Sequence, residues 1–307
     1  MSLDPQIAEL LDTLDAGFPP VHTMTGAEAR TTIRSRFVPN ARPEPVREVR
    51  DVSVSVDGGE VDVRVYRPDG HDGLPALVYA HGGGFVFCDL DSHDGLCRNL
   101  ANLIPAVVIS VGYRLAPEHR WPVAAEDVYA VTRWVAEHAQ DLGGDPTRIA
   151  VGGDSAGGNL AAVAALMARD RGGPTLAAQL LLYPVIAADF DNASYRQFGH
   201  GFYNPRPALR WYWDQYVPEP ADRTEPYASP LYARLDGLPP AVVVWAGHDP
   251  LRDEGIAYAD ALEGAGVTTV RCPFDGAIHG FMTMPMLDIA HAARRQASRE
   301  LAGLLGD

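Results

Sequence analysis

The sequence predicts an α/β fold, with a mostly parallel, doubly wound sheet, an antiparallel hairpin at one edge and a helical cap. Short apolar runs recur along the chain, as in strands that are buried on both faces of a sheet. Helical stretches separate most of these runs, and that alternation favours parallel strands. The chain has 307 residues and 47% hydrophobic content, which suffice for one large core. We therefore expect a single domain over residues 1–307.

The N-terminal part of the chain supplies helices and then the hairpin. Residues 1–45 predict one or two helices and a proline-marked link, with four apolar residues on one helical face: Ile7, Leu10, Leu11 and Leu14. Valines alternate with polar residues over 52–56 and again over 61–65, on either side of a turn at 57–59. This pattern predicts two antiparallel strands.

The rest of the chain alternates predicted strands and helices. Continuous apolar runs predict buried strands at 76–80, 106–111, 149–152, 178–183 and 241–246, with a weaker run at 268–272. Apolar residues at helical spacing predict helices over 122–139, 156–170 and 250–264. These elements together make the doubly wound part of the fold.

Two segments stand outside this alternation, and we expect them to cap the ends of the strands. One is the N-terminal region, about 1–45. The other is 190–220, which is rich in aromatic residues: Phe198, Phe202, Tyr203, Trp211, Tyr212, Trp213 and Tyr216. Ordinary core packing explains such aromatic residues equally well.

Charge and composition narrow the function classes. A net charge of −15 opposes binding to nucleic acid, because phosphates would be repelled. No apolar run is long enough to span a bilayer, and the N-terminus lacks the apolar core of a signal peptide. Three cysteines without C-x-x-C spacing suggest free thiols in a reducing cytoplasm.

A glycine-rich turn joins the strand at 149–152 to the helix at 156–170. Residues 153–157 read Gly-Asp-Ser-Ala-Gly and match G-x-S-x-G, with Ser155 at the centre. Small neighbours permit a strained turn, and the helix N-terminus brings free N–H groups close to the serine. A phosphate-binding turn is the alternative, but the strand–turn–helix context favours a nucleophile.

Three consecutive glycines follow His81 after the strand at 76–80. Glycines let the backbone approach a substrate, so we expect the amides of Gly83, Gly84 and Ala156 to stabilise an oxyanion. A merely flexible turn is the alternative. For His81 we favour a structural hydrogen-bonding role over a catalytic one.

Asp249 and His279 follow the last two predicted strands. With Ser155 they give the order nucleophile, acid, base, which is the chain order of α/β-hydrolases. Two further carboxylates, Asp253 and Glu254, fall inside the next helix, and we expect them to face elsewhere. Asp249 also precedes a proline, so it could be only a helix cap.

An acidic cluster superficially suggests a metal site. It comprises Asp89, Asp91, His93 and Asp94, and it lacks the glycine and terminal glutamate of a calcium loop. We favour Asp91 or Ser92 as the N-cap of a helix from about 93 to 104, with acids in its first turn. No metal or other cofactor is predicted.

Five stretches together resemble the bacterial hormone-sensitive-lipase-like carboxylesterases, in the subgroup with a GDSAGG elbow. They are HGGGF (81–85), YRLAPEHRWPVAAEDVYA (113–130), GGDSAGGNLAA (152–162), DPLRDEG (249–255) and HGF (279–281). The resemblance implies an α/β-hydrolase fold without a cofactor. It also implies hydrolysis of short- to medium-chain esters, often by homodimers.

Motif by motif, the resemblance implies Ser155 as nucleophile, Asp249 as acid and His279 as base. Cys88 departs from the family, which usually has glycine there, so we expect a narrower site wall and sensitivity to thiol reagents. Contacts with substrate are expected from four residues: Phe85, Asp154, Phe202 and Trp211.

The predicted function is that of a serine carboxylesterase acting on a small-molecule ester. An amidase, a lactonase or a peptidase stays open, because fold and triad do not set the leaving group. A non-catalytic receptor of the plant gibberellin-receptor kind also resembles this family. Such receptors lack the base, so His279 argues against that alternative.

Overall fold

Eight strands form one sheet in the computed structural model, which describes residues 2–306. The spatial order is β1-β2-β4-β3-β5-β6-β7-β8. The strands are β1 (Glu48–Val56), β2 (Gly59–Arg67), β3 (Leu74–Ala80), β4 (Val107–Val111), β5 (Gly144–Asp154), β6 (Ala178–Leu182), β7 (Ala241–His248) and β8 (Thr269–Ile278). β2 pairs antiparallel with both β1 and β4, and all other pairs are parallel. The predicted edge hairpin is therefore confirmed.

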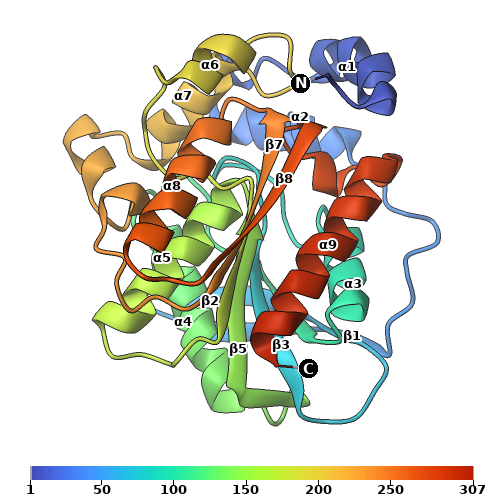
Figure 1. Cartoon of the computed structure of the whole chain (residues 1–307), viewed down its shortest axis with the longest axis vertical. Coiled ribbons are helices and arrows are strands. Elements are labelled where there is room, and N and C mark those ends of the chain that lie inside the picture. Colours follow the sequence, from blue (N-terminus) through green and yellow to red (C-terminus); the bar gives the residue numbers. More distant parts are fainter. Residues whose placement is uncertain (1, 307) are drawn as a thin grey trace.

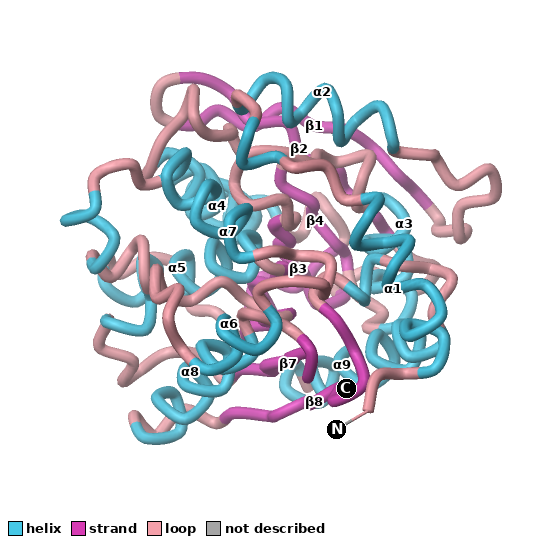
Figure 2. The backbone as a smooth tube through the Cα atoms, turned by 90° about the horizontal axis from the view of Figure 1, so that it is seen from above, coloured by secondary structure: helices cyan, strands magenta, loops and turns pink. Residues whose placement is uncertain are grey.

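Helices cover both faces of the sheet, which makes a three-layer molecule (Figure 2). One face carries α4 (Val123–His138), α5 (Ala156–Asp170) and α8 (Arg252–Gly264). The opposite face carries α3 (Asp94–Leu103) and α9 (Asp288–Leu305). Each face has its own apolar core, and α5 is buried along almost its whole length. The central strands read as continuous apolar runs because both of their faces are covered.

Four more helices lie at the carboxyl end of the strands (Figure 1). They are α1 (Pro5–Gly17), α2 (Gly26–Arg36), α6 (Ala193–Phe198) and α7 (Arg206–Tyr216), and short 3₁₀ turns occur at 21–23, 220–224, 230–232 and 281–283. α2 begins with a reciprocal cap, since Thr25 and Glu28 each bond the other's backbone N–H. α1 contacts the 190–220 segment, because Asp15 accepts a hydrogen bond from the Tyr203 amide at 3.0 Å.

The structure differs from the sequence analysis at two places. The helix at 288–305 was not predicted, because most of its buried residues are small or polar and give a weak apolar signal. The predicted cap of α3 is wrong: His93 occupies the N-cap without a side-chain cap bond. Ser92 instead exchanges hydrogen bonds with Asp89, which closes the preceding turn.

Candidate active site

Ser155 is the single residue between the end of β5 and the start of α5. It has φ 56° and ψ −118°, which a non-glycine residue rarely adopts. Three backbone hydrogen bonds hold it there: its N–H donates to Leu182 at 2.9 Å, and its carbonyl accepts from Val185 at 3.0 Å and from Asn159 at 3.2 Å. The turn therefore presents the hydroxyl above the sheet, in the geometry of a nucleophile elbow.

The three residues predicted to be catalytic form one continuous chain of hydrogen bonds. His279 Nε2 lies 2.9 Å from Ser155 Oγ, and His279 Nδ1 lies 2.7 Å from Asp249 Oδ2. Asp249 is fully buried and His279 is 7% exposed, whereas Ser155 is partly exposed. The carboxylate can orient the imidazole, and only the serine end of the chain is open to a substrate.

Asp249 fits both alternatives that the sequence left open. Its Oδ1 accepts a hydrogen bond from the Leu251 amide at 2.8 Å, as a turn-capping residue does, while its Oδ2 faces His279. The neighbouring carboxylates face elsewhere. Asp253 accepts from the Ser194 amide, and Glu254 accepts from the Ile186 amide at 2.6 Å.

The glycines after His81 lie in a tight loop beside the elbow, residues 81–87, which we call the oxyanion loop after its predicted role. Gly83 has φ 117°, and a Cβ atom built on it would lie 2.1 Å from the Phe87 carbonyl oxygen. No other residue fits there without moving the loop. The N–H groups of Gly83, Gly84 and Ala156 have no acceptor among residues 2–306. The Gly82 amide donates to Asp154 at 2.9 Å, which brings this loop next to the elbow, and an oxyanion site needs such free donors. The oxyanion role stays a prediction.

His81 has a structural environment. It is fully buried, stacks on Tyr113 with ring centroids 4.3 Å apart, and donates from Nδ1 to the Gly82 carbonyl at 2.7 Å. Burial, aided by the nearby His93, lowers the pKa of His81 to about 3. A neutral ring with these contacts agrees with the expected structural role.

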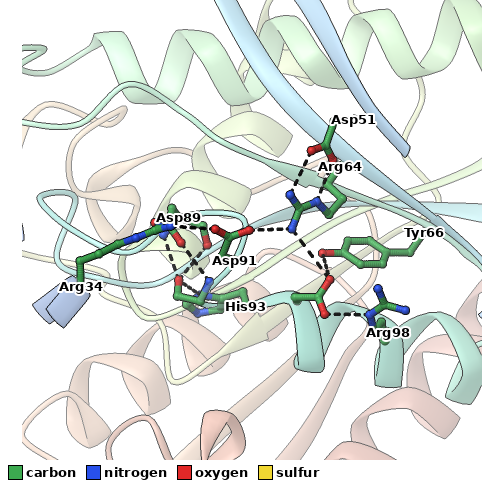
Figure 3. Close-up of polar contacts among 10 residues, drawn as sticks. Arg34, Asp51, Arg64, Tyr66, Asp89, Asp91, His93 and Arg98 are labelled. Atoms are coloured by element: carbon green, nitrogen blue, oxygen red, sulfur yellow. Dashed lines mark hydrogen bonds and ion pairs between the residues drawn. The ribbon is translucent and has the colours of Figure 1, made fainter. Parts of the chain in front are cut away.

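The acidic cluster at 89–94 is part of an ion-pair network that links four parts of the chain (Figure 3). Arg34 of α2 pairs with Asp89 and Asp91, and Asp91 also pairs with Arg64 of β2 at 2.9 Å. Asp94 accepts from Arg98 within α3. Each of these three carboxylates therefore has an arginine partner, which explains why the acidic residues cluster here. Among residues 2–306 no group of three possible metal ligands is found.

A cavity of about 900 Å³ lies between the N-terminal helices and the loop that follows β3. Its apolar walls come mainly from Leu14, Phe18, Ile33, Phe37, Leu115 and Tyr203, and Cys88 also contributes. Two of these residues adjoin the site. Cys88 follows the oxyanion loop, and a Cβ built on Gly280, next to His279, would lie 4.0 Å from the Tyr203 ring. The sequence indicated an amphipathic helical region here but not that it would wall a cavity.

The four residues expected to contact substrate do not line this cavity. Phe85 is buried and stacks on Tyr216 with centroids 3.9 Å apart. Phe202 packs on Phe198, and Trp211 packs on its neighbour in α7. Asp154 is buried, and its Oδ1 accepts internal hydrogen bonds from the Tyr79 hydroxyl and the Gly82 amide. Any contact of these residues with substrate stays a prediction.

Cys88 has a left-handed φ of 68°, which explains why glycine suits this position. Its side chain helps to form the cavity wall. Burial raises the pKa of the Cys88 thiol to about 12, so little reactive thiolate exists at neutral pH. Sensitivity to thiol reagents stays a prediction, and this pKa opposes it.

Comparison with known proteins identifies the family. Residues 77–283 match the profile of a family described by its alpha/beta hydrolase fold. The chain is 41% identical to the carboxylesterase NlhH of Mycobacterium tuberculosis, over 98% of this chain and 95% of the relative. It is 40% identical to the ethyl acetate hydrolase of Pseudomonas putida, over 92% of this chain and 93% of the relative.

Solved structures give the same result. The hyperthermophilic esterase from the archaeon Pyrobaculum calidifontis superposes with a TM-score of 0.91 at 40% identity, with 99% of both chains covered. A thermostable esterase from Pseudomonas putida superposes with a TM-score of 0.93 at 37% identity, covering 100% of this chain and 98% of the other. The resemblance to hormone-sensitive-lipase-like carboxylesterases is confirmed. The chain belongs to this α/β-hydrolase family and is a carboxylic ester hydrolase.

Proposed function

We propose that the chain hydrolyses its esters through a covalent acyl-enzyme on Ser155. His279 accepts the serine proton as Oγ attacks the ester carbonyl, and Asp249 keeps the imidazole in the tautomer whose Nε2 accepts. The three unpaired amides described above stabilise the resulting oxyanion. The alcohol leaves with the proton from His279, and water activated by the same imidazole then releases the acid.

One observation carries this proposal. The hydrogen-bond chain from Asp249 through His279 reaches Ser155 beside the unpaired amides of Gly83 and Gly84. Base and nucleophile meet at Ser155, and the Gly82–Asp154 hydrogen bond brings the loop with the free amides next to the elbow, which supports acyl transfer to water.

The test replaces the nucleophile. Ser155→Ala should lower kcat on p-nitrophenyl butyrate by about 10⁵-fold or more, because only the oxyanion site and binding would remain. A fluorophosphonate probe should label the native chain and not the variant. Undiminished turnover in Ser155→Ala would refute the mechanism. Comparing the ester with the matched p-nitroanilide distinguishes an esterase from an amidase or a peptidase.

We further propose short- to medium-chain esters as substrates, with segments 1–45 and 190–220 as the cap. The cavity supports this, since 900 Å³ is the size of a small-molecule site and its walls are mainly apolar. Contacts between the segments support a common cap: Phe18 lies edge-on to Tyr203 with centroids 5.3 Å apart. Arg30 of α2 donates to the Val86 carbonyl at 3.0 Å, which connects the cap to the oxyanion loop.

A substitution that fills the cavity tests the cap. Ile33→Trp should lower kcat/KM for an octanoate ester about 10-fold relative to an acetate ester, since lost apolar contacts act on the longer chain. Val38→Trp is the matched control, because Val38 lies just beyond α2 and is 83% exposed. An unchanged octanoate-to-acetate ratio in Ile33→Trp would show that the acyl chain lies elsewhere.

No helix among residues 2–306 is long and apolar enough to cross a bilayer. We propose a cytoplasmic enzyme with no nucleic-acid partner, supported by free cysteines and by the net charge of −15. The homodimer rests on the family resemblance alone, and light scattering would test it.

A further inference from the structure

A buried carboxylate precedes the proposed nucleophile and takes no part in the mechanism above. Asp154 is 3% exposed, and its Oδ1 accepts hydrogen bonds from the Gly82 amide at 2.9 Å and the Tyr79 hydroxyl at 2.8 Å. His93 Nε2 lies 3.2 Å from the same oxygen. A buried charge is costly unless it is paired and hydrogen-bonded, and these donors meet that need.

The Gly82 contact joins the two halves of the site. Gly82 immediately precedes the proposed oxyanion donors, and Asp154 immediately precedes Ser155, although 72 residues separate the pair in sequence. A Cβ atom on Gly82 would lie 2.4 Å from Asp154 Oδ2, so the loop backbone touches the carboxylate directly. Any shift of this carboxylate must therefore move the oxyanion loop relative to the serine.

His93 secures the carboxylate from the other side. It is 5% exposed, and its Nδ1 lies 3.0 Å from Ser92 Oγ, within the turn that Asp89 closes. Arg34 of α2 pairs with Asp89, so the same network reaches the helix that walls the cavity (Figure 3).

We propose that Asp154 and His93 form a positioning pair that sets the distance between the oxyanion loop and Ser155. Neither residue touches the reacting atoms. The pair acts through the Gly82 amide, and it keeps the two donors of the loop where the oxyanion develops. Preorganised donors contribute only if they are held in place before the reaction, so a displaced loop slows the chemical step and leaves substrate binding almost unchanged.

This inference rests on the proposed function. It predicts losses of kcat that differ in size among four variants of Asp154 and His93. Asp154→Ala removes every acceptor and should lower kcat about 10²-fold, near the loss measured for one oxyanion donor, with KM within about 3-fold. Asp154→Asn keeps an oxygen for the Gly82 amide and should lose less. His93→Ala should lower kcat roughly 10-fold, and His93→Gln, which restores a donor toward Asp154, should recover most of it.

A tetrahedral inhibitor separates positioning from a purely structural role. A trifluoromethyl ketone forms a hemiketal with the serine and places an oxyanion in the site. Its Ki should rise in parallel with the loss of kcat/KM across the four variants. Asp145→Asn is the control: Asp145 pairs with Arg148 at 3.0 Å near the amino end of β5, the opposite end of the strand from Asp154. It should lose stability while kcat and Ki stay unchanged.

The outcomes are distinguishable. An active Ser155→Ala refutes the proposed function itself. If Ser155→Ala is inactive but the folded Asp154 variants keep native kcat and Ki, the positioning pair is refuted. If neither Asp154 variant folds, the His93 variants decide, and equal activity of His93→Ala, His93→Gln and the native chain refutes the pair.

Discussion

The elbow after β5 and the oxyanion loop after β3 are neighbours in space, but they are held in different ways. Backbone groups hold the elbow: the Ser155 amide bonds Leu182 at the end of β6, and its carbonyl bonds Val185 in the segment that follows. The loop has backbone bonds as well, such as that from the Ala116 amide to the Phe85 carbonyl at 2.9 Å, but side chains add to its support. The Tyr113 hydroxyl donates to the His81 carbonyl at 2.8 Å, and Asp154 accepts from Gly82.

The difference predicts how each region responds to substitution. Backbone hydrogen bonds survive a change of side chain, so the elbow should keep its shape in most variants that still fold. The loop should shift when a distant side chain is removed, because part of its support comes from side-chain groups that only folding brings together. Substitutions far from Ser155 in sequence should therefore affect turnover mainly through the loop.

The largest expected effect is on the elbow side. Asp249→Asn keeps an oxygen for the Leu251 amide, but its NH₂ group cannot accept from His279, so kcat should fall about 10⁴-fold. The melting temperature should change little, because asparagine caps as well as aspartate. Asp253→Asn is the control and should leave kcat nearly unchanged. A near-native rate for Asp249→Asn would mean that capping is its whole role.

A smaller effect is expected from the loop. Tyr113→Phe keeps the ring that stacks on His81 and removes only the hydroxyl, so kcat should fall several-fold, up to about 10-fold, with about 1 kcal/mol of stability lost. Tyr258→Phe is the control, since Tyr258 is fully buried and its hydroxyl has no partner among residues 2–306. If both variants turn over at the native rate, the loop does not depend on the Tyr113 hydroxyl.

The smallest effect concerns the support behind the elbow. Burial raises the pKa of Glu254 well above its usual range, although the Ile186 and Ala187 amides oppose this. The folded chain then holds a proton that the unfolded chain releases above its ordinary carboxyl pKa. Stability therefore falls as pH rises from that ordinary value toward the raised one, by at most about 1.4 kcal/mol per pH unit.

Glu254→Gln keeps an acceptor for the Ile186 amide and cannot ionise. Urea unfolding between pH 5 and 8 should give a flatter pH dependence for this variant, and its stability should exceed that of the native chain at pH 8. Native kcat is expected, because the backbone bonds of Ser155 remain. An identical slope for both proteins would show that Glu254 ionises normally, and a lower kcat would contradict the comparison between elbow and loop.

Short-range pattern was sufficient for most of the fold. Apolar runs located the six parallel strands, and alternating valines located the hairpin, because side-chain period and turn chemistry act over a few residues. The elbow could also be predicted from the sequence, since a strand, small residues and a helix follow one another there. The alanine-rich α9 was missed because small side chains pack well but make the buried face of a helix hard to distinguish from its exposed face in the sequence.

Contacts between distant segments could not be read in this way. The sequence suggested Asp249 as either cap or acid, and the folded chain uses one carboxylate oxygen for each contact. It grouped Asp89, Asp91 and Asp94 as a cluster, whereas their cationic partners come from α2, β2 and α3. Residue order thus specified the strands, the elbow and the chemical types present. Folding alone supplied the Asp154–Gly82 contact and the cavity, because both require segments that share no local pattern to meet at the carboxyl end of one sheet.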